Sequence, residues 1–269
     1  MVRDRYLLLT FDLEEFDWPR ERGQSIDHEV QLQVTCAGLD LLRPVLEKQG
    51  VRATFFTTAS FAAARPVVVL ELAAQGHEIA SHGLAHSDDY RAMGLAEERE
   101  ALTAARLQLE ALIGRSVAGF RAPRLQVGRP QAIREAGYHY GASVHPTWVP
   151  GRYQALRAPR SPWREAGLVR VPISVTPWVH WPLSFFWFRL AGVRLSTWGA
   201  RLALADTGYL HLYFHPWEAV PLTQYGIPRW LAVRSGPPFV RMLEEFLTAM
   251  GPLESLTVGE YVQRSWTRS

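Results

Sequence analysis

The sequence predicts an α/β protein built as a closed or nearly closed barrel of parallel strands covered by helices. Short apolar runs alternate with longer amphipathic segments along most of the 269 residues, a repetition typical of a parallel sheet with helices on its face. About seven such units suit a β/α barrel better than a small open sheet. No low-complexity linker, internal repeat or break in composition divides the chain, so we expect a single domain over residues 1–269.

The first half of the chain alternates regularly between strand-like and helix-like segments. The apolar run at residues 5–12 predicts a buried strand, and residues 30–50 predict a helix that bends near Pro44 and closes on Gly50. Pro66 falls in the first turn of another predicted helix, where no backbone N–H is needed. The other segments expected here are strands at 51–58, 77–82, 117–123 and 138–144, and helices at 65–76, 95–113 and 128–137.

The second half is less regular, above all between Thr147 and Pro172. The stretch from Val171 to Phe188 carries no formal charge, but its three prolines argue against a membrane-spanning helix. The segments expected here are strands at 167–175, 208–216 and 253–258, and helices at 183–204, 238–250 and 258–265.

Composition and charge exclude several classes of protein. The net charge of +3 is modest and no basic run accompanies it, so a nucleic-acid partner is not expected. The single cysteine, Cys36, excludes an internal disulfide. The apolar run near the N-terminus is interrupted by Asp12, which argues against a signal peptide or anchor and favours a cytoplasmic location.

Polar residues of unusual chemistry follow four of the predicted strands. In a barrel of parallel strands, reactive side chains gather at the carboxyl ends of the strands. The candidates are Asp12 with Glu14, His82 with His86, Arg121, and His215.

The first strand end carries two carboxylates. Strand alternation places Asp12 and Glu14 on one face, with Leu13 opposite. Adjacent carboxylates repel unless a cation or a proton separates them, so one metal-ligating carboxylate beside one general base is a natural division of roles. Glu15 and Asp17 are expected to lie in a solvated acidic loop.

The other strand ends carry histidines and an arginine. His82 and His86 are four residues apart, a spacing that would put both imidazoles on one face of a helical turn. They form an incomplete zinc site that needs another ligand; the alternative is two unliganded histidines on a loop. Arg121 could orient a catalytic carboxylate or form a structural ion pair. His215 lies at a strand end, whereas His211 is expected deeper in the packing.

The order of these motifs, "TFDLE … SHGLAH … GFRAPR … YFHPWE", resembles the polysaccharide deacetylase family, carbohydrate esterase family four, from about Leu7 to Glu218. It is most similar to a subgroup with an Asp-x-Glu first motif and a His-Pro-Trp-Glu last motif. The resemblance implies a distorted (β/α) barrel of about seven strands. It also implies one divalent metal, usually zinc, with cobalt or manganese as alternatives.

The resemblance implies a role for each candidate residue. The metal ligands would be Glu14, His82 and His86. Asp12 would be the general base, Arg121 would steady it, His215 would be the general acid, and the backbone N–H of Arg124, which replaces the usual tyrosine, would help to hold an oxyanion.

Two positions depart from the family pattern. Gly83 replaces the usual serine or threonine after the first histidine. An aspartate expected near Gly141, which would tune the acid histidine, is missing, and Glu218 could substitute for it.

The implied function is a metal-dependent hydrolase that removes an N-acetyl or similar N-acyl group from an amino sugar in a glycan or lipid-linked saccharide. Two alternatives remain: a hydrolase of a non-sugar amide, such as a ureide or formamide, and a catalytically silent glycan-binding barrel. The aromatic-rich stretch at residues 171–194 predicts either a core helix or a peripheral membrane contact. For the latter, we expect Trp178, Trp181, Phe185, Phe186 and Trp187 to border the site.

Overall fold

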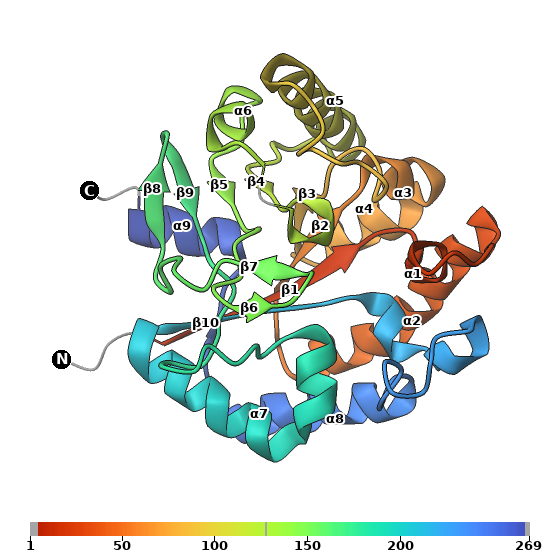
Figure 1. The fold of residues 1–269 in the computed structure, drawn as a ribbon, viewed down its shortest axis with the longest axis vertical. Coiled ribbons are helices and arrows are strands. Elements are labelled where there is room, and N and C mark those ends of the chain that lie inside the picture. Colours follow the sequence, from red (N-terminus) through yellow and green to blue (C-terminus); the bar gives the residue numbers. More distant parts are fainter. Residues whose placement is uncertain (1–4, 127, 267–269) are drawn as a thin grey trace.

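A computed structural model describes residues 5–126 and 128–266, and its centre is a curled sheet of mainly parallel strands (Figure 1). Seven strands run parallel in the order β10-β1-β2-β3-β4-β5-β9, and β8 pairs antiparallel with β9. This agrees with the distorted barrel of about seven strands that the sequence predicts. The strands of this sheet are β1 (Tyr6–Leu13), β2 (Ala53–Thr57), β3 (Glu78–Ser81), β4 (Gly119–Phe120), β5 (Tyr140–Gly141), β8 (Trp163–Glu165), β9 (Leu168–Arg170), β10 (Tyr209–Phe214) and the short β11 (Glu254–Ser255), which pairs with β1.

The segment after β9 closes much of the gap between β9 and β10. The N–H of Ile173 donates to the carbonyl of Val144 at 2.8 Å, and the N–H of Ser174 donates to the carbonyl of His211 at 2.9 Å. The curled sheet is therefore bridged by backbone hydrogen bonds although no regular strand fills this position.

Helices cover the outside of the sheet, with α5 and α6 at one side and α7 and α8 at the other (Figure 1). The helices are α1 (Trp18–Glu21), α2 (His28–Lys48), α3 (Ala59–Ala64), α4 (Pro66–Ala74), α5 (Leu95–Ile113), α6 (Pro130–Glu135), α7 (Phe185–Thr207), α8 (Pro237–Met250) and α9 (Val258–Trp266), with 3₁₀ turns η1 (Pro123–Leu125), η2 (Pro216–Ala219) and η3 (Leu222–Tyr225). None of the helices in the described ranges has the length and apolar character that a bilayer crossing requires.

The alternation of β1 determines which side chains enter the barrel. Leu7, Leu9 and Phe11 pack outward in the main core with the helices, whereas Leu8 packs in a separate inner cluster. That inner cluster includes Tyr261 of α9, so α9 closes the amino end of the barrel. Asp12, on the same face as Leu8, consequently points into the open carboxyl end.

Three local features differ from the sequence-based expectation. The residues between His82 and His86 form a loop, not a helical turn, because Gly83 has a φ of +89°. The helix expected at 183–204 is interrupted at Gly192, whose φ of 77° is not helical. A two-stranded hairpin, β6 (Trp148–Val149) with β7 (Tyr153–Gln154), lies in the irregular region.

Candidate active site

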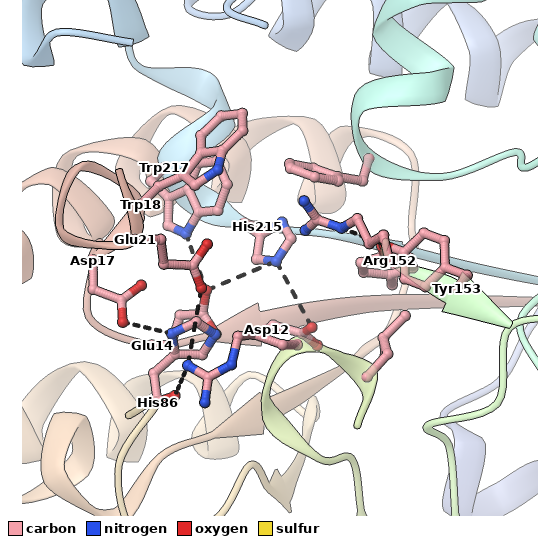
Figure 2. Close-up of a pocket in the computed structure, with 14 residues that line it drawn as sticks. Asp12, Glu14, Asp17, Trp18, Glu21, His86, Arg152, Tyr153, His215 and Trp217 are labelled. Atoms are coloured by element: carbon pink, nitrogen blue, oxygen red, sulfur yellow. Dashed lines mark hydrogen bonds and ion pairs between the residues drawn. The ribbon is translucent and has the colours of Figure 1, made fainter. Parts of the chain in front are cut away.

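The side chains singled out in the sequence come together at the carboxyl end of the barrel. A pocket opens there, and Asp12, Glu14, His86, Arg124 and His215 line it (Figure 2). His82 and Arg121 lie behind this wall and are fully buried. The distances between these groups give the pocket its chemical character.

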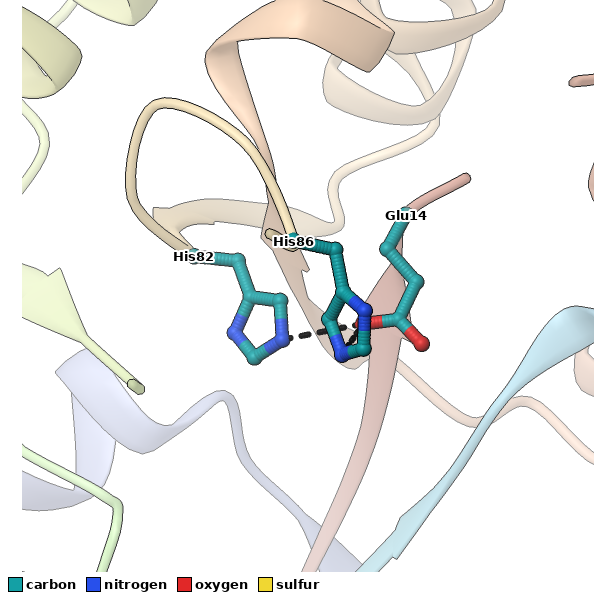
Figure 3. Close-up of side chains that lie close together, drawn as sticks. All are labelled: Glu14, His82 and His86. Atoms are coloured by element: carbon teal, nitrogen blue, oxygen red, sulfur yellow. Dashed lines mark hydrogen bonds and ion pairs between the residues drawn. The ribbon is translucent and has the colours of Figure 1, made fainter. Parts of the chain in front are cut away.

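Three side chains converge as a candidate metal site (Figure 3). The Oε2 atom of Glu14 lies 3.0 Å from Nε2 of His82 and 3.2 Å from Nε2 of His86. Ligands at the usual zinc distances of about 2.0–2.1 Å, placed tetrahedrally, would stand roughly 3.3 Å apart. The donor set and its spacing therefore fit one divalent ion.

Both imidazoles are oriented through their other ring nitrogen. Nδ1 of His82 lies 2.8 Å from the carbonyl oxygen of Arg121, so that nitrogen carries the proton and Nε2 presents its lone pair. Nδ1 of His86 lies 2.8 Å from Oδ2 of Asp17. A carboxylate behind a ligating histidine is a common support of metal sites. Asp17 is thus part of the site, and its assignment to a solvated acidic loop is wrong.

The electrostatics of this cluster favour a cation. Burial alone would raise the pKa of Glu14, but His86, His82 and His215 outweigh it and lower that pKa to about 2. Burial likewise opposes the charge on His86, yet Glu14, Asp17 and Glu21 raise the pKa of His86 to about 9. A pocket that draws a proton onto a buried imidazole has a negative potential, which also suits a divalent metal.

Asp12 is held by a buried arginine. Nη1 of Arg121 donates to Oδ1 of Asp12 at 2.6 Å, and Nη2 of Arg121 lies 2.9 Å from Nε2 of His211. The other carboxylate oxygen, Oδ2, lies 4.0 Å from Nε2 of His82 and 3.8 Å from Nε2 of His215. One oxygen of Asp12 is therefore fixed while the other faces the space beside the candidate metal site.

His211 lies deeper, as its position in the strand suggests. Because its Nε2 accepts from Arg121, its proton must be on Nδ1, which lies 3.1 Å from the carbonyl oxygen of Pro172. Burial and the charge of Arg121 hold the pKa of His211 well below its usual value. His211 is consequently a neutral packing residue that helps to position the guanidinium of Arg121.

His215 has a carboxylate partner only three residues away. Nδ1 of His215 lies 3.3 Å from Oε1 of Glu218, whose other oxygen accepts from Nε of Arg189 at 2.7 Å. The imidazole stacks on Trp217 with centroids 4.3 Å apart and meets the edge of Phe185 at 4.8 Å. Arg189 was not singled out in the sequence because nothing local relates it to Glu218.

Two further residues near the site have partners in the folded chain, and one of them, Glu15, corrects an expectation. The Arg124 side chain is tied to the loop after β3, since its terminal nitrogens donate to the carbonyls of His86 and Asp88 at 2.7 and 2.8 Å. Glu15 is buried and accepts from the hydroxyls of Thr58, at 3.0 Å, and Ser60, so it does not lie in a solvated loop.

The aromatic-rich stretch divides between core and surface. Trp178 and Trp181 are exposed, by 82% and 41%, whereas Phe186 and Trp187 are partly buried. Phe185 is buried and lines the pocket, so this stretch borders the site through one ring and faces solvent through others.

Comparison with known proteins points in one direction. A family model described as polysaccharide deacetylase matches residues 33–141. A chitooligosaccharide deacetylase of Sinorhizobium fredii is 40% identical over 80 residues, which are 29% of this chain and 37% of the relative. The aligned part thus spans well under half of that curated relative.

Solved structures extend the likeness over the whole fold. A Mycobacterium smegmatis protein assigned to the polysaccharide deacetylases superposes with a TM-score of 0.68 at 19% identity, over 99% of this chain and 91% of that one. A counterpart from Pseudomonas aeruginosa PAO1 gives 0.66 at 18% identity, over 98% and 91%. The Puue allantoinase structure gives 0.64 at 16% identity, over 97% and 91%. The matched segment and the shared fold support a relationship to the polysaccharide deacetylase family.

Proposed function

We propose that this protein is a metal-dependent hydrolase that removes an N-acetyl or similar N-acyl group from an amino sugar in a glycan or lipid-linked saccharide. The observation that carries the proposal is the convergence of Glu14, His82 and His86 beside an arginine-held carboxylate and a carboxylate-backed histidine. The matched deacetylase family model covers the segment with both histidines. The cytoplasmic location expected from the sequence is part of the same proposal.

Glu14, His82 and His86 would hold the metal, with zinc as the first expectation and cobalt or manganese as alternatives. A divalent ion at such a site supplies Lewis acidity and makes water more acidic. The partners of the two imidazoles, the Arg121 carbonyl and the partly buried Asp17, would keep their Nε2 atoms directed at it.

The remaining residues would move protons and stabilise charge. Oδ2 of Asp12 would accept a proton from the attacking water while Arg121 holds Oδ1. Nε2 of His215 would donate a proton to the departing amine, because an unprotonated amine is a poor leaving group. The backbone N–H of Arg124 would donate to the oxyanion that develops on the acyl carbonyl.

A panel of substrates tests the reaction class. Metal-loaded protein would be assayed against N-acetyl amino sugars and their oligomers, formamido sugars and allantoin, with Asp12→Asn as the inactive control. The proposal is supported if the unaltered protein releases acetate from the N-acetyl sugars and Asp12→Asn does not. Turnover of allantoin alone would favour the non-sugar amide hydrolase, an alternative supported by the fold shared with an allantoinase. Glycan binding without any turnover would indicate the silent barrel.

We also propose that the exposed side chains of residues 171–194, together with those of the next turns of α7, contact an anionic membrane surface. Val179, Trp181, Leu195 and Trp198 line one apolar groove, next to the exposed Trp178. Arg194 and Arg201 are exposed on the same face of α7 as Trp198, at four and three residues' distance. Exposed tryptophans bordered by arginines suit a lipid headgroup boundary.

Co-sedimentation with vesicles that contain anionic phospholipid tests this contact. Trp178→Ala combined with Trp198→Ala should abolish sedimentation, whereas Leu107→Ala, an exposed apolar residue of α5, should not. Equal behaviour of the double variant and the unaltered protein would contradict the membrane contact.

A further inference from the structure

A second groove continues from the catalytic pocket toward the surface. The two hollows share Arg124, Leu125, Arg152 and Tyr153 in their walls. The groove adds Arg91 and uncharged polar side chains, and none of the described residues that line it is an aspartate or a glutamate. A substrate bound at the candidate metal site could therefore extend directly into a cationic groove.

Arg152 lines both the pocket and the groove, and Figure 2 shows it in the wall of the pocket. It follows Gly151, whose φ of +72° makes the turn between β6 and β7. The Arg152 guanidinium lies over the rings of Tyr153, at 5.7 Å, and Phe185, at 5.4 Å, and its Nε donates to the Tyr153 hydroxyl at 3.1 Å. The Tyr153 hydroxyl is itself anchored, 2.8 Å from that of Tyr213. The Nε–H of the guanidinium is thus held by the Tyr153 hydroxyl, while neither terminal nitrogen has a hydrogen-bond partner among the described residues.

Of the four described carboxylates that line the pocket, three are engaged elsewhere. Asp12 pairs with Arg121 at 2.6 Å, Asp17 lies 2.8 Å from His86, and Glu14 faces both ligating histidines. The fourth, Glu21, lies 3.9 Å from Arg124 and makes no ion pair with Arg152, although, against the effect of burial, its charge still helps to raise the pKa of Arg152. Within the described part of the chain, no carboxylate oxygen lies within 4.0 Å of the Arg152 guanidinium, so its charge has no direct partner.

The other arginines of the groove are already committed. Arg124 donates to two loop carbonyls and lies 3.9 Å from Glu21, and Arg91 lies 3.5 Å from Asp89. Among the described residues of this groove, Arg152 is accordingly the arginine that is free to bind a ligand.

A second observation points to a ligand in the same groove. His145 lines it, is only 2% exposed, and neither ring nitrogen has a hydrogen-bond partner among the described residues. A buried imidazole without a partner is costly unless something else supplies the hydrogen bond. A bound hydroxyl or anionic oxygen would do so.

We propose that Arg152, with His145 beside it, forms a subsite for a negatively charged group, carboxylate or phosphate, on the substrate next to the sugar that is deacylated. A planar guanidinium with two free terminal nitrogens binds such groups through two parallel hydrogen bonds. This subsite deepens the proposed function and rests on it for the identity of the sugar. The substrate class is then an anionic glycan or a sugar phosphate, and neutral chitin-like chains would bind less tightly.

Binding titrations on the metal-loaded protein test the subsite without requiring turnover. The probes are N-acetylglucosamine, N-acetylglucosamine 1-phosphate and N-acetylmuramic acid, whose last two members carry a phosphate and a carboxylate. The unaltered protein should bind one or both anionic sugars at least tenfold more tightly than the neutral one, because hydrogen bonds to charged groups are worth about tenfold to a hundredfold in affinity. Whether the phosphate or the carboxylate sugar binds more tightly identifies the anionic group that the subsite prefers.

Arg152→Gln should remove this preference and leave affinity for the neutral sugar within about twofold, while Arg152→Lys should retain part of it because the charge remains but the fork is lost. Arg157→Gln, which removes an exposed arginine farther along the same segment, serves as the matched control and should keep the preference. Equal affinity for neutral and anionic sugars, or a preference that survives Arg152→Gln, would overturn the subsite. A preference lost in Arg152→Gln supports it even if none of the sugars is hydrolysed, and only the latter result would count against the proposed function.

Discussion

Replacement of Glu218 by glutamine should affect both stability and catalysis. Glu218 is fully buried and has three contacts: the N–H of His215 at 3.0 Å, Nδ1 of His215 at 3.3 Å, and Nε of Arg189 at 2.7 Å. Glutamine matches the shape of glutamate but removes its charge. Arg189, also fully buried, then loses its anionic partner.

The size of the stability loss depends on the hydrogen bonds that Arg189 retains in the variant. Breaking a buried ion pair by removing one partner costs about 3–5 kcal/mol. Arg189 still donates to the carbonyls of Leu231, at 3.1 Å, and Val233, at 2.6 Å, so the lower end applies. A loss of about 3 kcal/mol corresponds to a fall in Tm of roughly 6–12 °C for a domain of this size.

Urea unfolding of the unaltered protein and of Glu218→Gln measures this loss, with Glu254→Gln as the control. Glu254 pairs with Arg264 at 2.5 Å on the surface, where both side chains are about half exposed, so its replacement should cost less than about 1 kcal/mol. If Glu218→Gln unfolds within about 1 kcal/mol of the unaltered protein, the buried pair does not stabilise the fold as argued. The hydrolysis rate should also fall, by about 10²-fold, since a neutral amide no longer stabilises a positive charge on His215.

Three further predictions concern the site and its surroundings. Asp12→Asn and His215→Ala should each lower turnover about 10²–10⁴-fold while metal content, measured by elemental analysis, stays near that of the unaltered protein. Glu14→Gln should instead lose most of the bound metal in the same measurement, since it removes the anionic ligand. Burial, with Arg121 adding to it, lowers the pKa of His145 to about 3, below the unfolded value; its stabilising contribution is therefore complete above about pH 6.5 and lost as pH falls toward 3, by about 2 kcal/mol at pH 5. Urea unfolding at pH 7 and pH 5 should show a smaller difference in the His145→Leu variant.

The regular parts of the barrel could be predicted because their patterns are local. The strand expected at 5–12 is Tyr6–Leu13, and the helix expected at 95–113 has those bounds. A continuous apolar run indicates a buried strand, and a helical period indicates which face of a helix is buried, so both can be read from neighbouring residues alone. The short helix α1 and the β6–β7 hairpin have too few residues for either period to emerge. Their existence depends on packing against residues distant in the chain.

The site divides in the same way. Asp12 and Glu14 could be paired from strand alternation, but the contact of Asp17 with His86 depends on the loop after β3 bringing His86 across to it. Arg189 meets Glu218 only because α7 packs beside β10. Arg152 reaches the pocket from a hairpin whose position no sequence pattern announced.

The absence of an aspartate near Gly141 has a structural explanation in η2. His215 is followed by Pro216, which starts a 3₁₀ turn that carries Glu218 back to the N–H and the imidazole of His215. The partner of the imidazole therefore comes from the same turn as the imidazole, and the site needs no carboxylate from β5. A variant that restored an aspartate at position 141 would also face crowding, because a Cβ there lies 3.1 Å from the guanidinium of Arg170.

Gly83 can be explained by the same kind of local exchange. A Cβ at this position would lie 2.2 Å from the Tyr90 hydroxyl, so a serine or threonine cannot fit while Tyr90 is present. The Tyr90 hydroxyl donates to Oδ2 of Asp88 at 3.0 Å, and Asp88 accepts from the N–H groups of Leu84 and Ala85, both at 3.2 Å. A hydroxyl thus remains beside the loop that carries His86, but it comes from a tyrosine seven residues farther along the chain. Because the Tyr90 hydroxyl fills the space that a side chain at position 83 would need, replacing Gly83 alone should disturb the loop. The double variant Gly83→Ser with Tyr90→Phe would remove the clash with the hydroxyl oxygen but keep the backbone strain of a non-glycine residue at positive φ.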